Sequence, residues 1–306
     1  MSRSRSMTIC LAVDIGGTKL AAALIEMDSA SQPRMIVRHL AETRSSGNPQ
    51  LLIATLAELL EPLAASANYV AVASTGIIDH GILTALNPQN LGGLDRFPLH
   101  EVIAQITDLP VYLINDAQAA AWAEYLAYEQ LFADLAFITV STGVGTGLVL
   151  NHQLLTGPRG IAGHSGHMLA DPNGPLCGCG RRGCVEAIAS GRAIAAAGQA
   201  VFGDKCSGMQ VYQHYLQGDA QATAIIQRSA DAVAELIANL TITLDLDAII
   251  IGGGVGLAEN YIGLVEQALG KMPALYRPKL FPARCHTDAG LLGVAQWAAT
   301  ISKEKQ

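Results

Sequence analysis

Residues 9–25 read ICLAVDIGGTKLAAALI, which is two apolar runs joined by a short polar segment rich in glycine. Apolar runs of this length and composition are typical of buried strands. Asp14 and the glycines after it are residue types that favour tight turns. The stretch therefore predicts a buried β-hairpin whose tip carries Asp14, Gly16, Gly17, Thr18 and Lys19.

A second stretch repeats this pattern later in the chain. Residues 135–150 read LAFITVSTGVGTGLVL, an apolar run, the tip STGVGTG and a further apolar run. Asp14 and Ser141 hold matching places in the two stretches. An internal repeat of strand, glycine-rich tip and strand predicts two similar α/β halves, with a ligand-binding cleft between them.

The rest of the chain alternates helix-like and strand-like patterns, which is typical of α/β folds. Helical spacing of leucine and alanine predicts helices at 49–67, 117–127, 186–200, 220–244 and 289–300, and a further helix beginning near 257. Short apolar runs predict buried strands at 70–73, 111–114 and 248–251. We expect a first domain of residues 7–118, a second domain of residues 119–288, and a C-terminal helix, 289–302, that packs back on the first domain.

The composition argues against several classes of protein. The chain has 306 residues, half of them hydrophobic, and a formal net charge of −7. This length accommodates about two domains, and an acidic balance argues against a nucleic-acid-binding surface. No apolar run reaches the roughly 18 residues that a membrane-spanning helix needs. No apolar segment with a cleavage site follows the basic start MSRSRS, so we expect a cytoplasmic protein with reduced thiols.

Residues 163–186, GHSGHMLADPNGPLCGCGRRGCVE, concentrate cysteine and histidine in a segment rich in glycine and proline. Tetrahedral zinc takes four nitrogen or sulfur ligands, and three closely spaced thiols with one histidine supply them. The predicted ligands are His167, Cys177, Cys179 and Cys184, with His164 as the less favoured histidine. Four protein ligands leave no position for water, so the predicted zinc is structural. The alternative is a disulfide with one free thiol.

Glycines between strands let backbone N–H groups approach an anion closely, and Thr18 and Lys19 add a hydroxyl and a cation. One such tip alone is as consistent with a plain hairpin turn as with a phosphate site. The tips STGVGTG and GGGVG, the latter at 252–256, favour nucleotide binding, although none of the three has the spacing of a Walker A loop or a Rossmann fingerprint. The predicted nucleotide-binding residues are Asp14, Gly16, Gly17, Thr18, Lys19, Thr142, Gly143, Val144, Gly145, Gly253 and Gly254.

Taken together, DIGGTK, STGVGTG, GHSGH, CGCGRRGC with Glu186, and GGGVG resemble the ROK family of sugar kinases. The resemblance spans nearly the whole chain and implies the two-domain actin/hexokinase-like fold, which is related to ribonuclease H, with a zinc-binding loop inserted in it. Repressors of the family carry a helix-turn-helix ahead of the first tip, and only about a dozen residues stand there, so the resemblance implies the kinase branch.

Three segments resemble the bacterial branch of the family that phosphorylates N-acetylmannosamine. They are ASTGIIDHGILTALNPQNLGG at 73–93, INDAQAAAWAE at 114–124 and CVEAIASGR at 184–192. The resemblance implies transfer of the γ-phosphate of ATP, with Mg²⁺, to the 6-hydroxyl of N-acetyl-D-mannosamine, a step in sialic acid breakdown, by a homodimer. The alternative within the family is a kinase acting on N-acetylglucosamine or glucose. A sugar-sensing module without turnover is the alternative from another class.

The resemblance also assigns roles to single residues. Asp116 matches the catalytic acid of the family and is the predicted base, the alternative being a helix cap. Asp14 is expected to hold Mg²⁺ through water, the alternative being a turn-forming acid. Most family members have glutamate in a GExGH pattern where this chain has His164. The sugar-binding residues that the resemblance implies are Gly76, Asn90, Asn115, Asp116, His164, His167 and Glu186.

Overall fold

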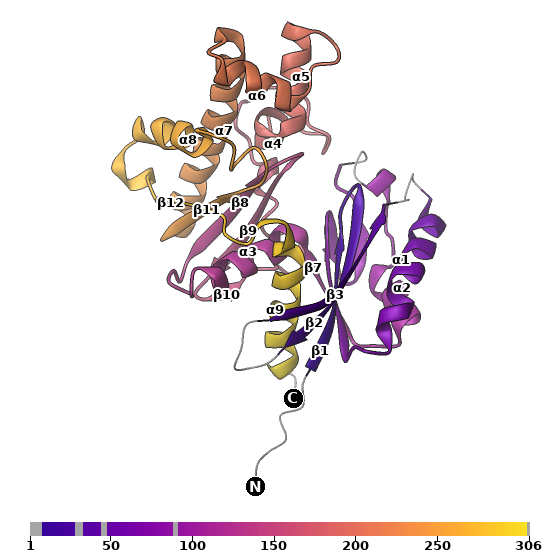
Figure 1. Ribbon diagram of the computed structural model, residues 1–306. Coiled ribbons are helices and arrows are strands. Elements are labelled where there is room, and N and C mark those ends of the chain that lie inside the picture. The colour runs from indigo at the N-terminus through magenta and orange to yellow at the C-terminus, as the bar shows by residue number, and fades with distance from the viewer. Residues whose placement is uncertain (1–7, 28–32, 44–47, 88–90, 305–306) are drawn as a thin grey trace. The chain divides into compact units, whose positions relative to one another are not determined.

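The structure, a computed structural model, describes residues 8–27, 33–43, 48–87 and 91–304. The chain forms two compact units (Figure 1). Unit 1 comprises the chain up to Ala127, the segment Thr156–Ala162 and the chain from Thr287 onward, and unit 2 comprises Tyr128–Leu155 and Gly163–His286. Met7 and Asn90, which the sequence placed at the start of the first domain and in the sugar site, lie outside the described residues.

Unit 1 is built on a five-stranded sheet in the order β3-β2-β1-β4-β7. The strands are β1 (Thr8–Ile15), β2 (Lys19–Met27), β3 (Arg34–Glu42), β4 (Tyr69–Ser74) and β7 (Val111–Asn115). The first three strands pair antiparallel, whereas β1, β4 and β7 run parallel. The predicted hairpin is therefore confirmed, with Asp14 opposite Ala21 near its tip.

Side chains alternate along the strands of this sheet and give it two different faces. Leu11 and Val13 belong to a leucine-rich core that includes residues of the helices α1 (Pro49–Ala64) and α2 (Leu99–Thr107). The alternate residues of β1 include Ala12, and small side chains on this second face let α9 (Ala289–Glu304) pack against β1, β2 and β4. Figure 1 shows α1 and α2 together on one side of the sheet and α9 on the other.

The boundary of unit 1 differs from the predicted one at residue 118. Helix α3 (Asp116–Ala127) belongs to unit 1 over its whole length, because it packs against α9. The two helices approach so closely that a Cβ on Gly293 would lie 1.9 Å from the carbonyl oxygen of Ala119. Gln118 donates from Nε2 to the Ala162 carbonyl at 2.9 Å, which ties the segment 156–162 to unit 1 as well. No pattern in the sequence indicated that this segment belongs to the first unit.

Three further elements of unit 1 lie between β4 and α2. They are the hairpin strands β5 (Ile77–Asp79) and β6 (Ile82–Thr84) and the short 3₁₀ turn η1 (Leu91–Gly93). The sequence did not predict them, because they are too short to show a periodic pattern. The hairpin carries Gly76 at its start, where a φ of +94° favours glycine.

Unit 2 repeats the sheet of unit 1, in the order β10-β9-β8-β11-β12. The strands are β8 (Leu135–Val140), β9 (Val144–Leu150), β10 (Gln153–Leu154), β11 (Ala248–Gly252) and β12 (Lys279–Pro282). β8 and β9 form an antiparallel hairpin, and β8, β11 and β12 run parallel. Since β1 and β8 occupy the same position in their sheets and each begins a hairpin, the predicted internal repeat is confirmed.

The helices of unit 2 pack around one large apolar core. They are α4 (Val185–Ala189), α5 (Gly191–Phe202), α6 (Gly208–Leu216), α7 (Ala220–Leu244) and α8 (Tyr261–Gly270). Three short 3₁₀ turns accompany them: η2 (Ser165–His167), η3 (Ala274–Tyr276) and η4 (His286–Asp288), the last at the C-terminal end of the unit. The predicted helix 186–200 is two helices, because Ser190 is extended and its hydroxyl caps α5 by accepting from Ala193 N at 3.1 Å. The helix expected near 257 begins at Tyr261, after a turn through Gly253 with φ of +85°.

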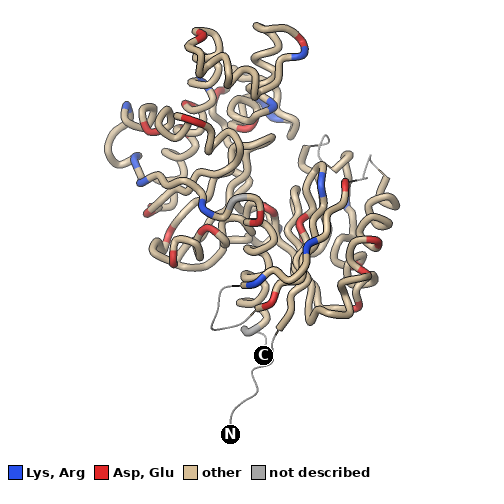
Figure 2. Tube along the Cα trace, in the orientation of Figure 1, with Lys and Arg blue, Asp and Glu red and all other residues tan. Residues whose placement is uncertain are grey.

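The surface of the described chain carries both signs of charge. Figure 2 shows basic and acidic residues interspersed along both units, as the modest net charge leads one to expect. None of the helices in the described part of the chain has the length and apolarity that crossing a membrane requires.

Candidate functional site

Four donor groups of the segment 163–186 come together in unit 2. The ring nitrogen of His167 and the sulfur atoms of Cys177, Cys179 and Cys184 all lie within 4.8 Å of one another. The cluster contains His167 and not His164, so the structure places the favoured histidine beside the thiols. All of these cysteines are free thiols, and the Cys179 and Cys184 sulfurs are 3.7 Å apart, so the alternative with a disulfide is wrong for this structure.

The distances inside this cluster suit a tetrahedral zinc. Zn–S bonds of about 2.3 Å and Zn–N bonds of about 2.0 Å in a tetrahedron place two sulfurs about 3.8 Å apart and a sulfur and a nitrogen about 3.5 Å apart. The Cys179 and Cys184 sulfurs are 3.7 Å apart, and the Cys177 sulfur lies 3.6 Å from Nδ1 of His167. The donor set and these two distances therefore fit one zinc ion.

Backbone geometry explains how so short a segment gathers the three thiols. Gly180, with φ of +89°, turns the chain so that its N–H donates to the Cys177 carbonyl at 2.9 Å, and Cys177 N donates to the Arg181 carbonyl at 2.7 Å. A Cβ on Gly183 would lie 1.6 Å from the Asp171 carbonyl oxygen, so only glycine fits there. The glycines of CGCGRRGC thus permit the tight fold that brings the thiols together.

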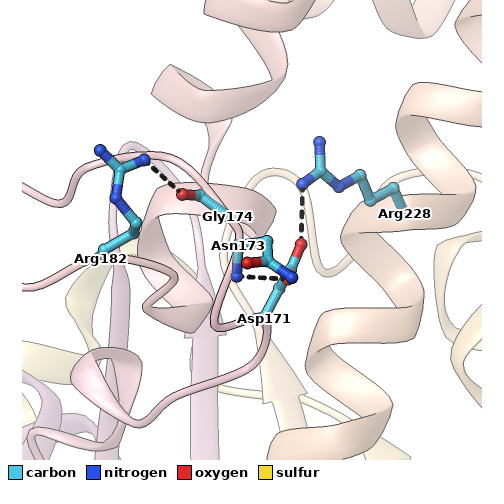
Figure 3. A network of polar contacts seen from close by, with 5 residues as sticks. All are labelled: Asp171, Asn173, Gly174, Arg182 and Arg228. Carbon is cyan, nitrogen blue, oxygen red and sulfur yellow. Dashed lines mark hydrogen bonds and ion pairs between the residues drawn. The ribbon is translucent and has the colours of Figure 1, made fainter.

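A second set of contacts braces the outer part of this loop (Figure 3). Asp171 forms an ion pair with Arg228 of α7 at 3.3 Å and also accepts from Asn173 N at 2.9 Å. Arg182 donates to the Gly174 carbonyl at 2.9 Å. Arg228 and Arg182 are exposed, so each contact contributes little by itself. The Asp171–Arg228 pair connects the loop to α7, the long helix of unit 2, and the Arg182 contact joins two parts of the loop.

The remaining predicted sugar ligands of unit 2 lie close to the metal cluster. Glu186 stands in α4, which begins directly after Cys184, and its carboxylate and the ring of His164 both influence the pKa of His167. Burial has the largest effect and lowers the pKa of His167, while the Glu186 carboxylate raises it. The structure therefore brings His164, His167 and Glu186 into one neighbourhood beside the thiols.

Two of the predicted phosphate tips adjoin each other in unit 2. The tip STGVGTG connects β8 to β9, and the tip GGGVG follows β11, the neighbour of β8. Val255 N and Gly256 N both donate to the Val140 carbonyl, at 2.9 and 3.0 Å. A Cβ on Gly253 would lie 2.3 Å from the same oxygen. Glycine is therefore required for this approach, which brings Gly253 and Gly254 beside the tip that carries Thr142, Gly143, Val144 and Gly145.

The third tip lies in unit 1, between β1 and β2. Gly16 N donates to the Lys19 carbonyl at 3.0 Å, and the hydroxyl of Thr43 donates to the Gly16 carbonyl at 2.8 Å. Gly17, Thr18 and Lys19 are exposed. The tip is thus held at its base while its backbone and the Lys19 side chain face solvent, as a phosphate site requires. No pattern in the sequence indicated this role for Thr43, which directly follows β3.

Asn115 and Asp116 stand at the junction of β7 and α3. The Asn115 side chain donates to the Gly76 carbonyl at 2.9 Å and accepts from Ala117 N at 2.9 Å. Asp116 Oδ1 also accepts from Ala117 N, at 2.8 Å, so the carboxylate is oriented by the first turn of α3. The structure brings the predicted sugar ligands Gly76, Asn115 and Asp116 together. It also shows that Asn115 holds the β5–β6 hairpin in place, a role the sequence did not indicate.

Asp14 lies close enough to Asp116 for the two charges to interact. Burial raises the pKa of Asp14 to about 7, the Asp116 carboxylate adds to this rise, and Arg38 partly opposes it. The first turn of α9 abuts Asp14 as well, since a Cβ on Gly290 would lie 2.7 Å from its Oδ2. Two acids in a half-buried position create an excess of negative charge that a divalent cation would relieve.

Asp14→Asn is expected to make the ligand-free protein more stable than wild type above pH 7, by up to about 4 kcal/mol. A carboxyl whose pKa is raised by folding stabilises the folded state fully below its unfolded pKa, near 4, and this stability is lost as the pH rises through about 7. The amide does not titrate, so the difference in free energy of unfolding between variant and wild type should shrink as the pH falls toward 4. Thermal unfolding from pH 4 to 9 measures it, with exposed Asp95→Asn as control. If the free energies of unfolding of Asp14→Asn and wild type changed in parallel with pH, the raised pKa of Asp14 in the folded protein would be contradicted.

Comparisons with known proteins match nearly the whole chain. A model of the ROK family matches residues 10–301. The chain is 55% identical over 285 residues to an N-acetylmannosamine kinase from Escherichia fergusonii, covering 93% of this chain and 96% of that protein. It is 51% identical over 296 residues to an N-acetylmannosamine kinase from Pasteurella multocida, covering 96% and 98%.

A solved structure shares the fold. The ROK family glucokinase from Streptomyces griseus, in complex with glucose and AMPPNP, matches with a TM-score of 0.75 and 29% identity, covering 96% of this chain and all of that one. Family, relatives and fold thus agree over the same residues that carry the metal cluster, the tips and Asp116.

Proposed function

Because this chain belongs to the ROK family, we propose that it transfers the γ-phosphate of ATP to the 6-hydroxyl of N-acetyl-D-mannosamine, a step in sialic acid breakdown. The observation that carries the proposal is the identity of 51 to 55% with N-acetylmannosamine kinases over more than nine-tenths of the chain. The Asp116 carboxylate and the glycine-rich tips support the proposal, because phosphoryl transfer uses a base and amides that bind phosphate. The proposal includes a cytoplasmic location and assembly as a homodimer. Light scattering on the purified protein measures its mass and so tests the homodimer.

Asp116 is the proposed general base. Phosphoryl transfer forms a bond between the sugar oxygen and the γ-phosphorus while the bond to the β-phosphate oxygen breaks and ADP leaves. The proton of the 6-hydroxyl passes to the Asp116 carboxylate, which its hydrogen bond from Ala117 N orients. Gly76 and Asn115, which are joined by a hydrogen bond, form the proposed wall of the sugar site on this side.

The glycine-rich tips and Asp14 are proposed to bind MgATP. Backbone N–H groups of the tips donate to phosphate oxygens, and Lys19 adds a positive charge. Mg²⁺ neutralises phosphate charge when it is bound with ATP. Asp14 is proposed to hold it through water, because the Asp14 carboxyl interacts with that of Asp116 in a part-buried position. Burial raises the pKa of Asp14 most, and the charge of Asp116 adds to the rise.

The cluster of His167 with Cys177, Cys179 and Cys184 is proposed to hold one structural zinc ion. Zinc supplies a fixed crosslink for the loop, since its four ligands leave no position for water. His167 binds it through Nδ1, so its other nitrogen can face the sugar beside His164 and Glu186. The metal loop therefore orients the proposed sugar ligands of unit 2.

A panel of sugars tests the proposal. Purified protein with MgATP is assayed for ADP formation on N-acetylmannosamine, N-acetylglucosamine, glucose and mannose, and kcat/KM is compared. We expect the highest value for N-acetylmannosamine. A higher value for glucose or N-acetylglucosamine would replace the proposed sugar but keep the reaction, and sugar binding without ADP formation would favour a sensing module.

His164→Glu is expected to narrow the preference for N-acetylmannosamine over N-acetylglucosamine by about ten- to a hundredfold in kcat/KM. A carboxylate accepts two hydroxyl hydrogen bonds, whereas a neutral imidazole offers one donor and one acceptor. The axial acetamide of N-acetylmannosamine changes the arrangement of groups at C2, and a polar group left unpaired by the wrong epimer costs about 1 to 3 kcal/mol. If the ratio of kcat/KM for N-acetylmannosamine to that for N-acetylglucosamine did not change, His164 would not be the residue that determines sugar specificity.

A further inference from the structure

The tip STGVGTG is held from outside its own hairpin by one continuous segment, residues 186–192. Gly191 N donates to the Ser141 carbonyl at 2.7 Å, and Arg192 N donates to the Thr142 carbonyl at 3.4 Å. Val144 N, at the other side of the tip, donates to Oε2 of Glu186 at 3.1 Å. This segment begins two residues after Cys184, so the chain that leaves the metal loop contacts the tip at Ser141, Thr142 and Val144.

The side chain of Arg192 adds a contact to this segment, because its Nε also donates to the Thr142 carbonyl, at 3.4 Å. Glu186 provides the other side-chain contact with the tip. Its carboxylate occupies the space beside Gly143, where an added Cβ would lie 2.6 Å from Oε2 and would meet no other residue within 4 Å. The N–H of Val144 therefore donates to Glu186 in this structure, so we leave it out of the proposed phosphate donors. The amides of Thr142, Gly143 and Gly145 remain the proposed donors of this tip.

We propose that Glu186 is a positioning residue for the nucleotide: by binding Val144 N it fixes the conformation in which the tip presents its amides to phosphate. The inference rests on the proposed kinase function and adds a role for Glu186 that does not involve the sugar. A tip with fixed amides binds an anion better than a mobile one, because no conformational freedom is lost on binding.

Charge alone predicts the opposite effect. A carboxylate close to a phosphate site repels the phosphate, so its removal would tighten nucleotide binding. Glu186→Gln separates the two effects, because the amide oxygen of glutamine still accepts from Val144 N while the negative charge is gone. Positioning predicts that Gln binds nucleotide as well as wild type and that Ala binds it worse. Repulsion predicts that both variants bind it better.

The experiment is calorimetric titration of the sugar-free protein with MgADP. We expect Glu186→Ala to raise the Kd about tenfold, Glu186→Gln to leave it within about twofold, and the exposed Glu235→Ala on α7, which loses the same charge, to leave it unchanged. Tighter or unaltered binding by Glu186→Ala would overturn the inference. If wild type binds no MgADP, the proposed kinase function fails. This outcome differs from failure of the Glu186 inference, in which wild type binds MgADP and Glu186→Ala binds it equally well or better.

Gly143→Ala provides a second test that leaves Glu186 in place. The added methyl displaces the carboxylate from Val144 N, so it should raise the Kd for MgADP about as much as Glu186→Ala does. In the Glu186→Ala background the methyl meets nothing, so the double variant should bind no worse than Glu186→Ala alone. Gly263→Ala on α8, where a Cβ also meets nothing, is the matched control. Additive losses from Gly143→Ala and Glu186→Ala would contradict the proposed contact.

Discussion

Asp116→Asn is expected to lower kcat by about two to four orders of magnitude while the affinity for the sugar stays near that of wild type. The amide is almost isosteric with the carboxylate, and its oxygen can still accept the hydrogen bond from Ala117 N, so the start of α3 should keep its structure. It cannot accept the proton of the 6-hydroxyl at neutral pH, which is the step assigned to Asp116.

The measurement combines steady-state kinetics with calorimetric titration of the sugar. Asp108→Asn is the matched control in unit 1, because this exposed residue ends α2 in a left-handed conformation that asparagine also adopts. The control should keep full activity. A kcat near the wild-type value in Asp116→Asn, with sugar bound, would remove Asp116 from proton transfer and leave it as a helix cap.

Cys179→Ser is expected to abolish zinc binding and to lower kcat/KM for the sugar by about a hundredfold or more. Wild type should contain about one zinc per chain, since the four donor atoms lie within 4.8 Å of one another. Without the metal, the loop keeps its backbone hydrogen bonds and the exposed Asp171–Arg228 pair, but it loses the crosslink that joins His167 to the thiols. His167 and the start of α4 with Glu186 should therefore lose their fixed positions. Thermal stability should fall with the metal content.

Metal analysis by mass spectrometry, with kinetics on the same samples, measures this effect. Cys206→Ser makes the same change at a buried cysteine outside the cluster and should keep the zinc. A Cys179→Ser protein that is free of metal and fully active would contradict a structural zinc that orients the sugar site.

Much of the fold follows from patterns that need no tertiary information. The apolar runs around Asp14 and Ser141 identify the two hairpins, because buried strands and glycine-rich turns have strong local signatures. The predicted helix 220–244 matches α7 to the residue, since its apolar periodicity is long and unbroken. The division of 186–200 at Ser190 was missed, because one extended residue does not interrupt an alanine-rich pattern.

The residue types of the site were predictable from the sequence, but most of its contacts were not. Dense thiols and a nearby histidine were enough to predict the donor set, since few other chemistries use that combination. Contacts that depend on which segments meet in space were not predictable. Glu186 reaching Val144, Asn115 holding the Gly76 carbonyl, and Gln118 binding the segment 156–162 all join residues that are distant in sequence and of common types.

The central claim is phosphorylation of N-acetylmannosamine at its 6-hydroxyl, and identification of the product tests it most directly. Purified protein is incubated with MgATP and N-acetyl-D-mannosamine, and the product is examined by ³¹P–¹H correlation NMR and by mass. The account predicts one new phosphate monoester coupled to the two protons on C6, formed in equal amount with ADP. No phosphorylated sugar, or a phosphate coupled to the proton on C1, would contradict it.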